Sequence, residues 1–267
     1  MNYCTDFLSG IALYLLISVF ICINVDASPP PTPTVAASIK KSSTTTPLAF
    51  YPNGRDRPHD YEILREEVHY SGWRKVIRRS VHANNKNGEP HNQDRKVIDF
   101  DVIDQAHTGG GAVIVFAWNS TSKTATLVRE YMPGPHRVLS GLAAGIVEEG
   151  KHSGGKESDG EPDSLVAARC ELEEECHLAG GTWYRLTEEG VSVPMDKYVV
   201  TEITPYLVID AEHVHDPRPL DDEEDIEIVR GVTATGVLRM IREGDFNLVG
   251  GWGALLALEK LRELGEI

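Results

Sequence analysis

Three glutamates lie close together in the segment SLVAARCELEEECHL, which begins at Ser164. Glu171, Glu174 and Glu175 follow one another at the helical spacing i, i+3 and i+4, which makes their side chains neighbours on a helix surface. Like charges at this spacing destabilise a helix by roughly 0.2–0.5 kcal/mol per pair. A divalent cation would relieve the repulsion, since Mg2+ prefers carboxylate and phosphate oxygens. The spacing therefore indicates a magnesium site, with a solvated acidic helix face as the alternative.

A helix is predicted to carry these carboxylates. The apolar residues of the segment recur every three or four positions, which predicts one buried stripe made of Leu165, Ala168, Leu172 and Cys176. Asp163 or Ser164 is the expected N-cap, directly after Pro162. A short apolar strand with a glycine turn is expected at 139–145. This strand, the loop after it and the helix would together position the carboxylates.

This strand, loop and helix resemble the Nudix box, whose family pattern is G-x5-E-x7-R-E-U-x-E-E-x-G-U, where U is aliphatic. The matching residues are Gly145, Glu171, Leu172, Glu174, Glu175 and Leu178. Cys170 stands in place of the arginine, with Arg169 beside it, and His177 stands in place of the last glycine. Lys151 occupies the position of the first glutamate, for which Glu161 is the candidate substitute.

The resemblance implies an α/β fold, the Nudix α/β/α sandwich with a mixed β-sheet. Two further strands are expected at 69–77 and 97–103, joined by the polar stretch 83–95. They resemble the N-terminal β-strand extension of the ADP-ribose and ADP-sugar pyrophosphatases within the family. The expected domains are therefore an N-terminal strand region at 51–108 and a Nudix hydrolase domain at 109–267.

The remaining alternation of strands and helices agrees with this fold. Strands are expected at 112–118, 124–131, 197–209 with an interruption at Pro205, and 226–229, and helices at 235–243 and 252–264.

The implied reaction is hydrolysis of the pyrophosphate bond in a nucleoside diphosphate linked to a sugar, ADP-ribose or an ADP-sugar. Its products would be a nucleoside monophosphate and a sugar phosphate. Trp73 and Phe100 match aromatic positions that stack on the nucleobase, with ordinary core aromatics as the alternative. Arg129 and Arg137 are the candidates for binding the pyrophosphate, because Met132 stands where the family commonly has a second arginine.

The resemblance also implies a metal site and a catalytic base. The implied metal ligands are Glu171, Glu175, Glu224 and the backbone carbonyl of Ala144, with Mg2+ as the metal and Mn2+ as an alternative. The catalytic candidates are Glu224, Glu175 and Glu174, the first two as base or water-orienting group. Glu224 belongs to an acidic run at 221–225, which could instead be a solvated loop. The competing function is a Nudix-fold nucleotide-binding or sensing module with weak or no turnover.

The net charge and the N-terminal segment bear on partners and location. The chain has 267 residues and a formal net charge of −15, so no nucleic-acid partner is expected. An apolar run at 8–25 indicates a signal peptide at 1–27, or an uncleaved signal anchor in a membrane. Residues 28–50 are rich in Pro, Ser and Thr and are expected to form a disordered linker. The expected location is the secretory pathway, the ER lumen or outside the cell, with a membrane or an organelle reached by that route as alternatives.

The cysteines, one sequon and the family resemblance add three expectations. Cys170 and Cys176 would lie about 9 Å apart along one helix and on different faces, too far for a disulfide. Asn119 begins an N-glycosylation sequon in a predicted hairpin turn. The resemblance implies a small nucleotide-sugar substrate and a homodimer with exchanged N-terminal strands.

Overall fold

The computed structural model describes residues 61–83, 97–105, 111–148, 152, 162–220 and 225–267. All of them belong to one compact unit, Pro58–Ile267. The predicted signal or anchor at 1–27 and the predicted linker at 28–50 lie outside the described residues. Of the helices described, none has the length and apolar character needed to cross a membrane.

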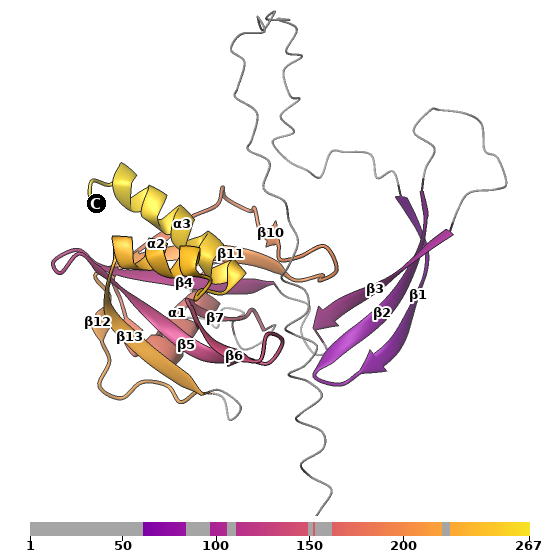
Figure 1. Ribbon diagram of the computed structural model, residues 1–267, viewed down its shortest axis with the longest axis horizontal. Coiled ribbons are helices and arrows are strands. Elements are labelled where there is room, and N and C mark those ends of the chain that lie inside the picture. The colour runs from indigo at the N-terminus through magenta and orange to yellow at the C-terminus, as the bar shows by residue number, and fades with distance from the viewer. Residues whose placement is uncertain (1–60, 84–96, 106–110, 149–151, 153–161, 221–224) are drawn as a thin grey trace, which may run out of the picture. The chain divides into compact units, whose positions relative to one another are not determined.

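An antiparallel three-stranded sheet comes first in the chain (Figure 1). Its strands are β1 (Tyr61–Ser71), β2 (Arg74–Ala83) and β3 (Val97–Gln105), in that order. Gly72 and Trp73 separate β1 from β2, so the single strand predicted at 69–77 is wrong. Apolar residues continue on both sides of this two-residue turn and conceal it in the sequence. The strand predicted at 97–103 is confirmed.

The second sheet contains both parallel and antiparallel pairs. Its strands are β4 (Ala112–Asn119), β5 (Thr124–Met132), β6 (Arg137–Gly141), β7 (Ala143–Ile146), β9 (Thr182–Arg185), β10 (Val193–Pro194), β11 (Glu202–Ile209) and β13 (Ile226–Thr233). The main path runs β10-β11-β4-β5-β13, and only β11 and β4 pair in parallel among these described strands. Two short strands, β8 (Leu178–Ala179) and β12 (Glu212–His213), pair with each other.

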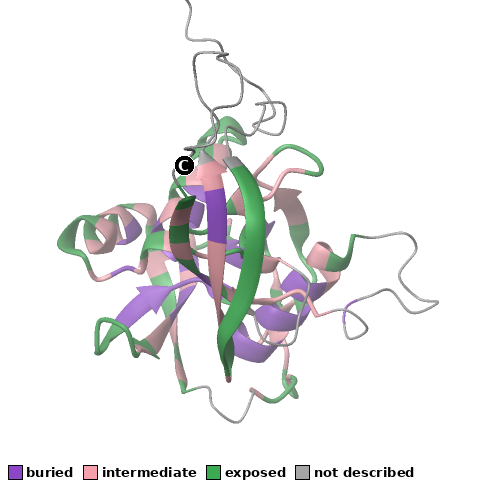
Figure 2. Cartoon of the chain, turned by 90° about the vertical axis from the view of Figure 1, so that its right-hand side faces the viewer, coloured by how far each residue is buried: buried purple, intermediate pink, exposed green. Residues whose placement is uncertain are grey.

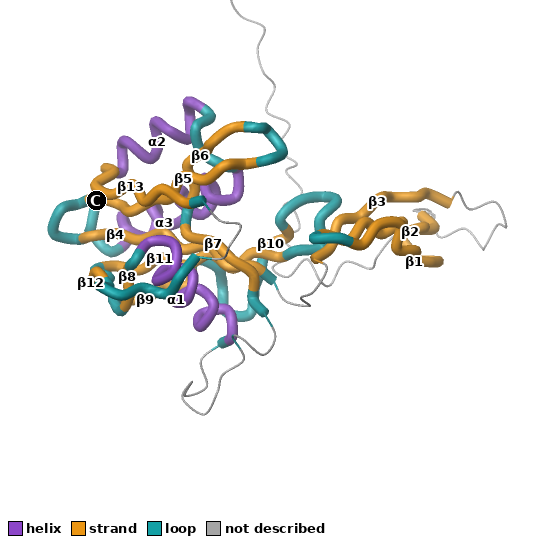
Figure 3. Tube along the Cα trace, turned by 90° about the horizontal axis from the view of Figure 1, so that it is seen from below, coloured by secondary structure: helices purple, strands orange, loops and turns teal. Residues whose placement is uncertain are grey.

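Helices cover both faces of this second sheet, as Figure 3 shows for α1 and α2. The helices are α1 (Asp163–Cys176), α2 (Ala234–Glu243) and α3 (Leu248–Glu263). Along β4, Val113 and Val115 belong to the apolar cluster that includes α1, whereas Ile114 and Phe116 belong to the cluster that includes α2 and α3. Both faces of β4 are therefore buried, which explains its unbroken apolar sequence. The expected α/β/α sandwich with a mixed sheet is confirmed.

Helix α1 begins at Asp163, one residue before the start that an Asp163 cap predicts and two before the start that a Ser164 cap predicts. Its N-cap is Pro162, which has no side-chain hydrogen bond to offer, and both Asp163 and Ser164 lie inside the helix. The Ser164 hydroxyl shares a 2.8 Å hydrogen bond with the hydroxyl of Tyr206 on β11. The predicted N-cap at Asp163 or Ser164 is therefore wrong, because the serine is used to attach the helix to the sheet. The predicted apolar stripe of α1 is confirmed.

Helix α3 begins at Leu248, four residues before the predicted start at 252. Asn247 caps it, with its side-chain oxygen accepting a 2.6 Å hydrogen bond from the Gly250 N–H. Glycines in this first turn weaken the helical pattern in the sequence. Gly253 is needed there because a Cβ atom would overlap the side chain of Ile114 on β4. The glycines let the helix pack closely against the sheet, but they also make its start hard to recognise in the sequence.

Strand β11 runs unbroken through Pro205, so the predicted interruption at that residue is wrong. On one edge β11 pairs with β4 over its whole length from Ile203. On the other edge the pairing passes from β10 at Ile203 to β9 at Tyr206. Pro205 lies in the gap between these two partners. Because no residue of either strand is paired with it on this edge, its missing N–H breaks no hydrogen bond of the sheet there.

Candidate active site

The three glutamates of α1 are buried. Glu171, Glu174 and Glu175 are only 7%, 8% and 5% exposed. Carboxylates are seldom buried unless they are paired or bind a cation. A solvated acidic helix face, the alternative considered for this cluster, does not describe these three side chains.

Glu171 and Glu175 lie on the face of α1 that meets strand β7. The Ala144 N–H donates a 2.9 Å hydrogen bond to Oε2 of Glu175. At the next residue, a Cβ atom on Gly145 would overlap the carboxylate of Glu171. The two carboxylates therefore contact adjacent residues of one strand, and Gly145 is required because the Glu171 carboxylate occupies the space of a side chain.

Glu174 faces a different neighbour, the segment between β12 and β13. From that segment Arg218 Nη1 donates a 2.8 Å hydrogen bond to the Cys170 sulfur and lies 3.9 Å from Oε1 of Glu174. Its Nε lies 3.5 Å from Oε2 of Glu173. Arg169, the residue adjacent to Cys170, instead places its guanidinium 5.9 Å from the ring centre of Trp183.

Burial dominates the titration of both cysteines of α1. It raises the pKa of the Cys170 thiol, while the Arg218 charge acts in the opposite direction. Burial, followed by the nearby Glu175 carboxylate, raises the pKa of Cys176 to about 12. Both thiols are therefore protonated at neutral pH, and neither forms a disulfide.

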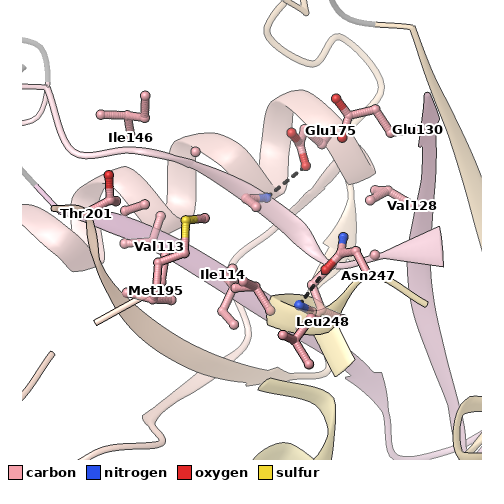
Figure 4. Close-up of a pocket in the computed structure, with 18 of the residues that line it drawn as sticks. Val113, Ile114, Val128, Glu130, Ile146, Glu175, Met195, Thr201, Asn247 and Leu248 are labelled. Carbon is pink, nitrogen blue, oxygen red and sulfur yellow. Dashed lines mark hydrogen bonds between the residues drawn. The ribbon is translucent and has the colours of Figure 1, made fainter. Parts of the chain in front are cut away.

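A cavity of about 410 Å3 opens beside Glu175 (Figure 4). It arises where the sheet divides: β4 pairs with β5 over Ala117–Asn119 but with β7 over Ala112–Val115. Residues from both branches and from the start of α3 line it, among them Val113, Val128, Glu130, Ala144, Glu175 and Asn247. The cavity thus has a mainly apolar lining with a few polar groups, one of them Glu175 from the glutamate helix. Such a lining is typical of a small-molecule site.

Glu130, on β5, is a second carboxylate of this cavity, which the sequence analysis did not identify. Burial raises the pKa of its side chain. A raised pKa beside another buried carboxylate is typical of functional sites, although structural groups also show it. No local motif singles out Glu130, because its proximity to Glu175 depends on the divided sheet.

The two predicted base-stacking residues lie on the three-stranded sheet. Trp73 is 69% exposed in the turn between β1 and β2, and Phe100 is half-buried on β3. Neither is among the described residues that line the cavity, whereas Arg74, next to Trp73, is. Stacking of a nucleobase on Trp73 and Phe100 stays a prediction.

Neither of the two predicted pyrophosphate-binding arginines is among the described residues that line the cavity. Arg129 lies on β5 between Val128 and Glu130, and its buried Nε has no hydrogen-bond partner in the described chain. Arg137 is exposed on β6 and donates a 3.0 Å hydrogen bond to the Gly244 carbonyl. Their binding of pyrophosphate likewise stays a prediction.

The remaining predicted carboxylates lie outside the described residues. Glu224, the candidate base and metal ligand, belongs to residues 221–224, and Glu161 belongs to residues 153–161. The loop position Lys151 is also outside. The structure therefore brings Glu171, Glu175 and Ala144 together, places Glu174 beside Arg218, and leaves Glu224 without a test.

The residues around Glu171 and Glu175 fit a magnesium ion by their chemistry. In the described part of the chain, no three His, Cys, Asp or Glu side chains are arranged to hold a metal by themselves. Mg2+, however, is usually bound through one or two carboxylates together with substrate phosphates and water. Two buried carboxylates against one strand, one of them lining a cavity, meet that requirement.

Among the solved structures that are similar to this chain is one that covers most of its length. It is described as "Crystal structure of ADP compounds hydrolase", with a TM-score of 0.57 and 20% sequence identity, covering 78% of this chain and 97% of that chain. No family model and no curated protein sequence matches the chain. A likeness at this identity shows a shared fold, so the expected α/β/α sandwich with a mixed sheet is confirmed.

Proposed function

We propose that this protein is a Mg2+-dependent hydrolase of the pyrophosphate bond in a nucleoside diphosphate linked to a sugar, with ADP-ribose or an ADP-sugar as substrate. The observation that carries the proposal is the pair of buried carboxylates, Glu171 and Glu175, that lie against β7, where Glu175, Ala144 and Gly145 line the cavity. The similar fold of an ADP compounds hydrolase supports the same class of substrate.

In this proposal Glu171, Glu175, the Ala144 carbonyl and Glu224 hold the metal. When bound, the metal neutralises pyrophosphate charge and lowers the pKa of a water molecule. The chain's own contribution is placement. Ala144 and Gly145 fix the two helix carboxylates relative to the cavity, so a diphosphate that enters it meets them in a set geometry. Glu224 or Glu175 would accept the proton of the attacking water or orient it.

The rest of the substrate would contact residues around the cavity. Arg129 and Arg137 are the proposed cations for the pyrophosphate, and Trp73 and Phe100 the proposed platforms for the nucleobase. The apolar floor formed by residues such as Val113 and Val128 would exclude water from the reacting bond.

A nucleotide-binding module with little turnover is the second candidate. The observation in its favour is that Oε2 of Glu175 accepts a hydrogen bond from the Ala144 N–H, which occupies one lone pair of a proposed metal ligand. Cys170 and Met132, which stand where the family has arginines, also favour it. Such a module would bind the nucleotide and leave the pyrophosphate bond intact.

Turnover in the presence of Mg2+ separates the two candidates. The purified chain is incubated with Mg2+ and, in turn, ADP-ribose, ADP-glucose, UDP-glucose and NADH, and the nucleoside monophosphate is quantified by chromatography. We expect release from at least one compound and a loss of at least about 100-fold in Glu175→Gln, as for an essential metal ligand. Glu259→Gln, an exposed carboxylate on α3, is the matched control and should behave as wild type.

Two results would contradict the hydrolase. One is nucleotide binding by calorimetry without release of a monophosphate at any Mg2+ or Mn2+ concentration, which would support the binding module. The other is full turnover in Glu175→Gln, which would place the chemistry elsewhere.

A further inference from the structure

Arg218 contacts three residues of α1. Its Nη1 donates to the sulfur of Cys170 at 2.8 Å and lies 3.9 Å from Glu174, and its Nε lies 3.5 Å from Glu173. The three contacted residues are spaced i, i+3 and i+4, so one planar guanidinium spans a full helical turn. A guanidinium can do this because its donors point in fixed, divergent directions.

The contacts differ from those of an ordinary surface ion pair. The Glu174 side chain is only 10% exposed, whereas the Arg218 side chain is 50% exposed. A carboxylate that is removed from water is stabilised by a charged partner. An arginine that remains partly solvated can be that partner with only a small desolvation penalty. The buried Cys170 sulfur fixes Nη1 at one end, which orients the guanidinium beside Glu174.

Position 170 itself has a short, uncharged side chain. A cysteine side chain carries no positive charge in either protonation state, so Cys170 offers the neighbouring carboxylates none. The guanidinium that lies beside Glu173 and Glu174 comes instead from the segment between β12 and β13, 48 positions further along the chain.

We propose that Arg218 is a positioning residue for the metal site: it holds Glu174 and the adjoining turn of α1 so that Glu171 and Glu175 keep their places against β7. The proposal rests on the proposed function. Arg218 touches neither substrate nor metal in it, and acts through Glu174. The helix itself has a cysteine and no arginine at position 170, and the guanidinium beside these carboxylates belongs to Arg218.

The sign of the effect on metal affinity tests this role. A positive charge near a metal site repels the cation, so removing it by itself makes metal binding tighter. Loss of positioning makes metal binding weaker, typically 10–100-fold for partners of metal ligands. Because Arg218 is half exposed, we expect Arg218→Gln to weaken binding by about three- to tenfold. Charge and positioning thus predict opposite directions.

Mn2+ serves as the probe, with its binding to the full chain measured by electron paramagnetic resonance of the free ion. The same titration is made for wild type, Arg218→Gln and Arg218→Lys, with melting temperatures recorded for each. Arg218→Lys keeps the charge but cannot span Cys170 and Glu174 together, so it should also weaken binding, by at least about threefold. Arg239→Gln removes an equal charge from the exposed face of α2 and should leave binding unchanged.

A Glu174→Gln background shows whether Arg218 acts through that carboxylate. If it does, Arg218→Gln has a clearly smaller effect there than in wild type, because the two residues share one interaction. Equal effects in both backgrounds would overturn the assignment. So would Mn2+ binding to Arg218→Gln that is as tight as to wild type, or tighter, or wild-type binding by Arg218→Lys.

The outcomes also separate this inference from the proposed function. Mn2+ binding that is lost in Glu175→Gln and weakened in Arg218→Gln, without turnover of any substrate, would refute the hydrolase but support the role of Arg218. Turnover with unchanged Mn2+ binding in Arg218→Gln would refute only the role of Arg218. No Mn2+ binding by the wild-type chain, either alone or with ADP-ribose present, would refute both.

Discussion

The carboxylate of Glu171 lies where a side chain of residue 145 would be. This contact gives the glycine of the box a physical reason: backbone and carboxylate approach each other more closely than a Cβ atom permits. The φ angle of Gly145 is not among the positive values of the described chain, so the requirement is for space and not for a special backbone conformation. A single methyl group therefore suffices to test the arrangement.

Replacement of Gly145 by alanine is expected to lower both stability and turnover. Either the Glu171 carboxylate or strand β7 must move, and such overpacking costs about 1–3 kcal/mol. In a domain of this size the melting temperature should fall by about 2–10 °C, as measured by calorimetry. Gly134→Ala is the matched control, because nothing lies within 4 Å of a Cβ atom at that turn position. Wild-type stability and turnover in Gly145→Ala would contradict the contact.

Helix α1 shows which parts of the site can be predicted from sequence. Local spacing predicts the helix, its apolar stripe and the clustering of Glu171 with Glu175, because a 3.6-residue period can be recognised within a short stretch of sequence. It does not predict the place of Glu130 in the cavity or the contacts of Arg218 with α1, because both depend on the tertiary fold. The β1 to β2 turn and the start of α3 were missed for a related reason: apolar residues or glycines needed for packing obscured the boundary.

The C-terminal end of α1 explains another position of the box pattern. His177 follows the helix with a φ of 54°, in the left-handed region, and its N–H bonds to the Glu173 and Leu172 carbonyls. Glycine adopts this conformation without strain, which accounts for the glycine of the family pattern.

His177→Gly is therefore expected to stabilise the protein by about 0.5–1 kcal/mol, equivalent to roughly 1–4 °C in melting temperature. The imidazole also contacts the ring of His213, so His177→Ala is the necessary control. Alanine removes the same ring contact but keeps a Cβ atom in the left-handed region, and should bring no gain. Equal melting temperatures for both variants would show that residue 177 carries no backbone strain.

At the level of the whole molecule, the three-stranded sheet exposes large apolar side chains. β1 is exposed from Glu62 to Ser71, as the green strand in Figure 2 illustrates. Val68 and Tyr70 on β1 are each 60% exposed. Exposed apolar side chains on an edge strand are a hallmark of surfaces that meet another chain. We therefore predict that β1 forms the interface of the homodimer that the family resemblance implies.

We expect the purified chain to be a dimer, and a Val68→Glu, Tyr70→Glu double variant to be a monomer. Two carboxylates on β1 would have to be buried without partners in such an interface. Size-exclusion chromatography with light scattering measures the mass directly. Leu255→Glu, an exposed apolar residue of α3, is the control and should remain dimeric. A monomeric wild type, or a dimeric double variant, would contradict this prediction.

The parallel pairing of β4 with β11 also has a consequence for how the chain folds. Ile203 pairs with Ala112, so this pair must enclose the whole stretch of chain that contains β5, β6, β7 and α1. The β1–β2 and β2–β3 pairs, in contrast, join strands that follow each other directly. Closing a long loop loses more chain entropy and slows the search for native contacts. We therefore expect the sheet beneath the glutamate helix to form late, after β11 has been synthesised, with its rate limited by long-range pairs such as this one and that of β5 with β13.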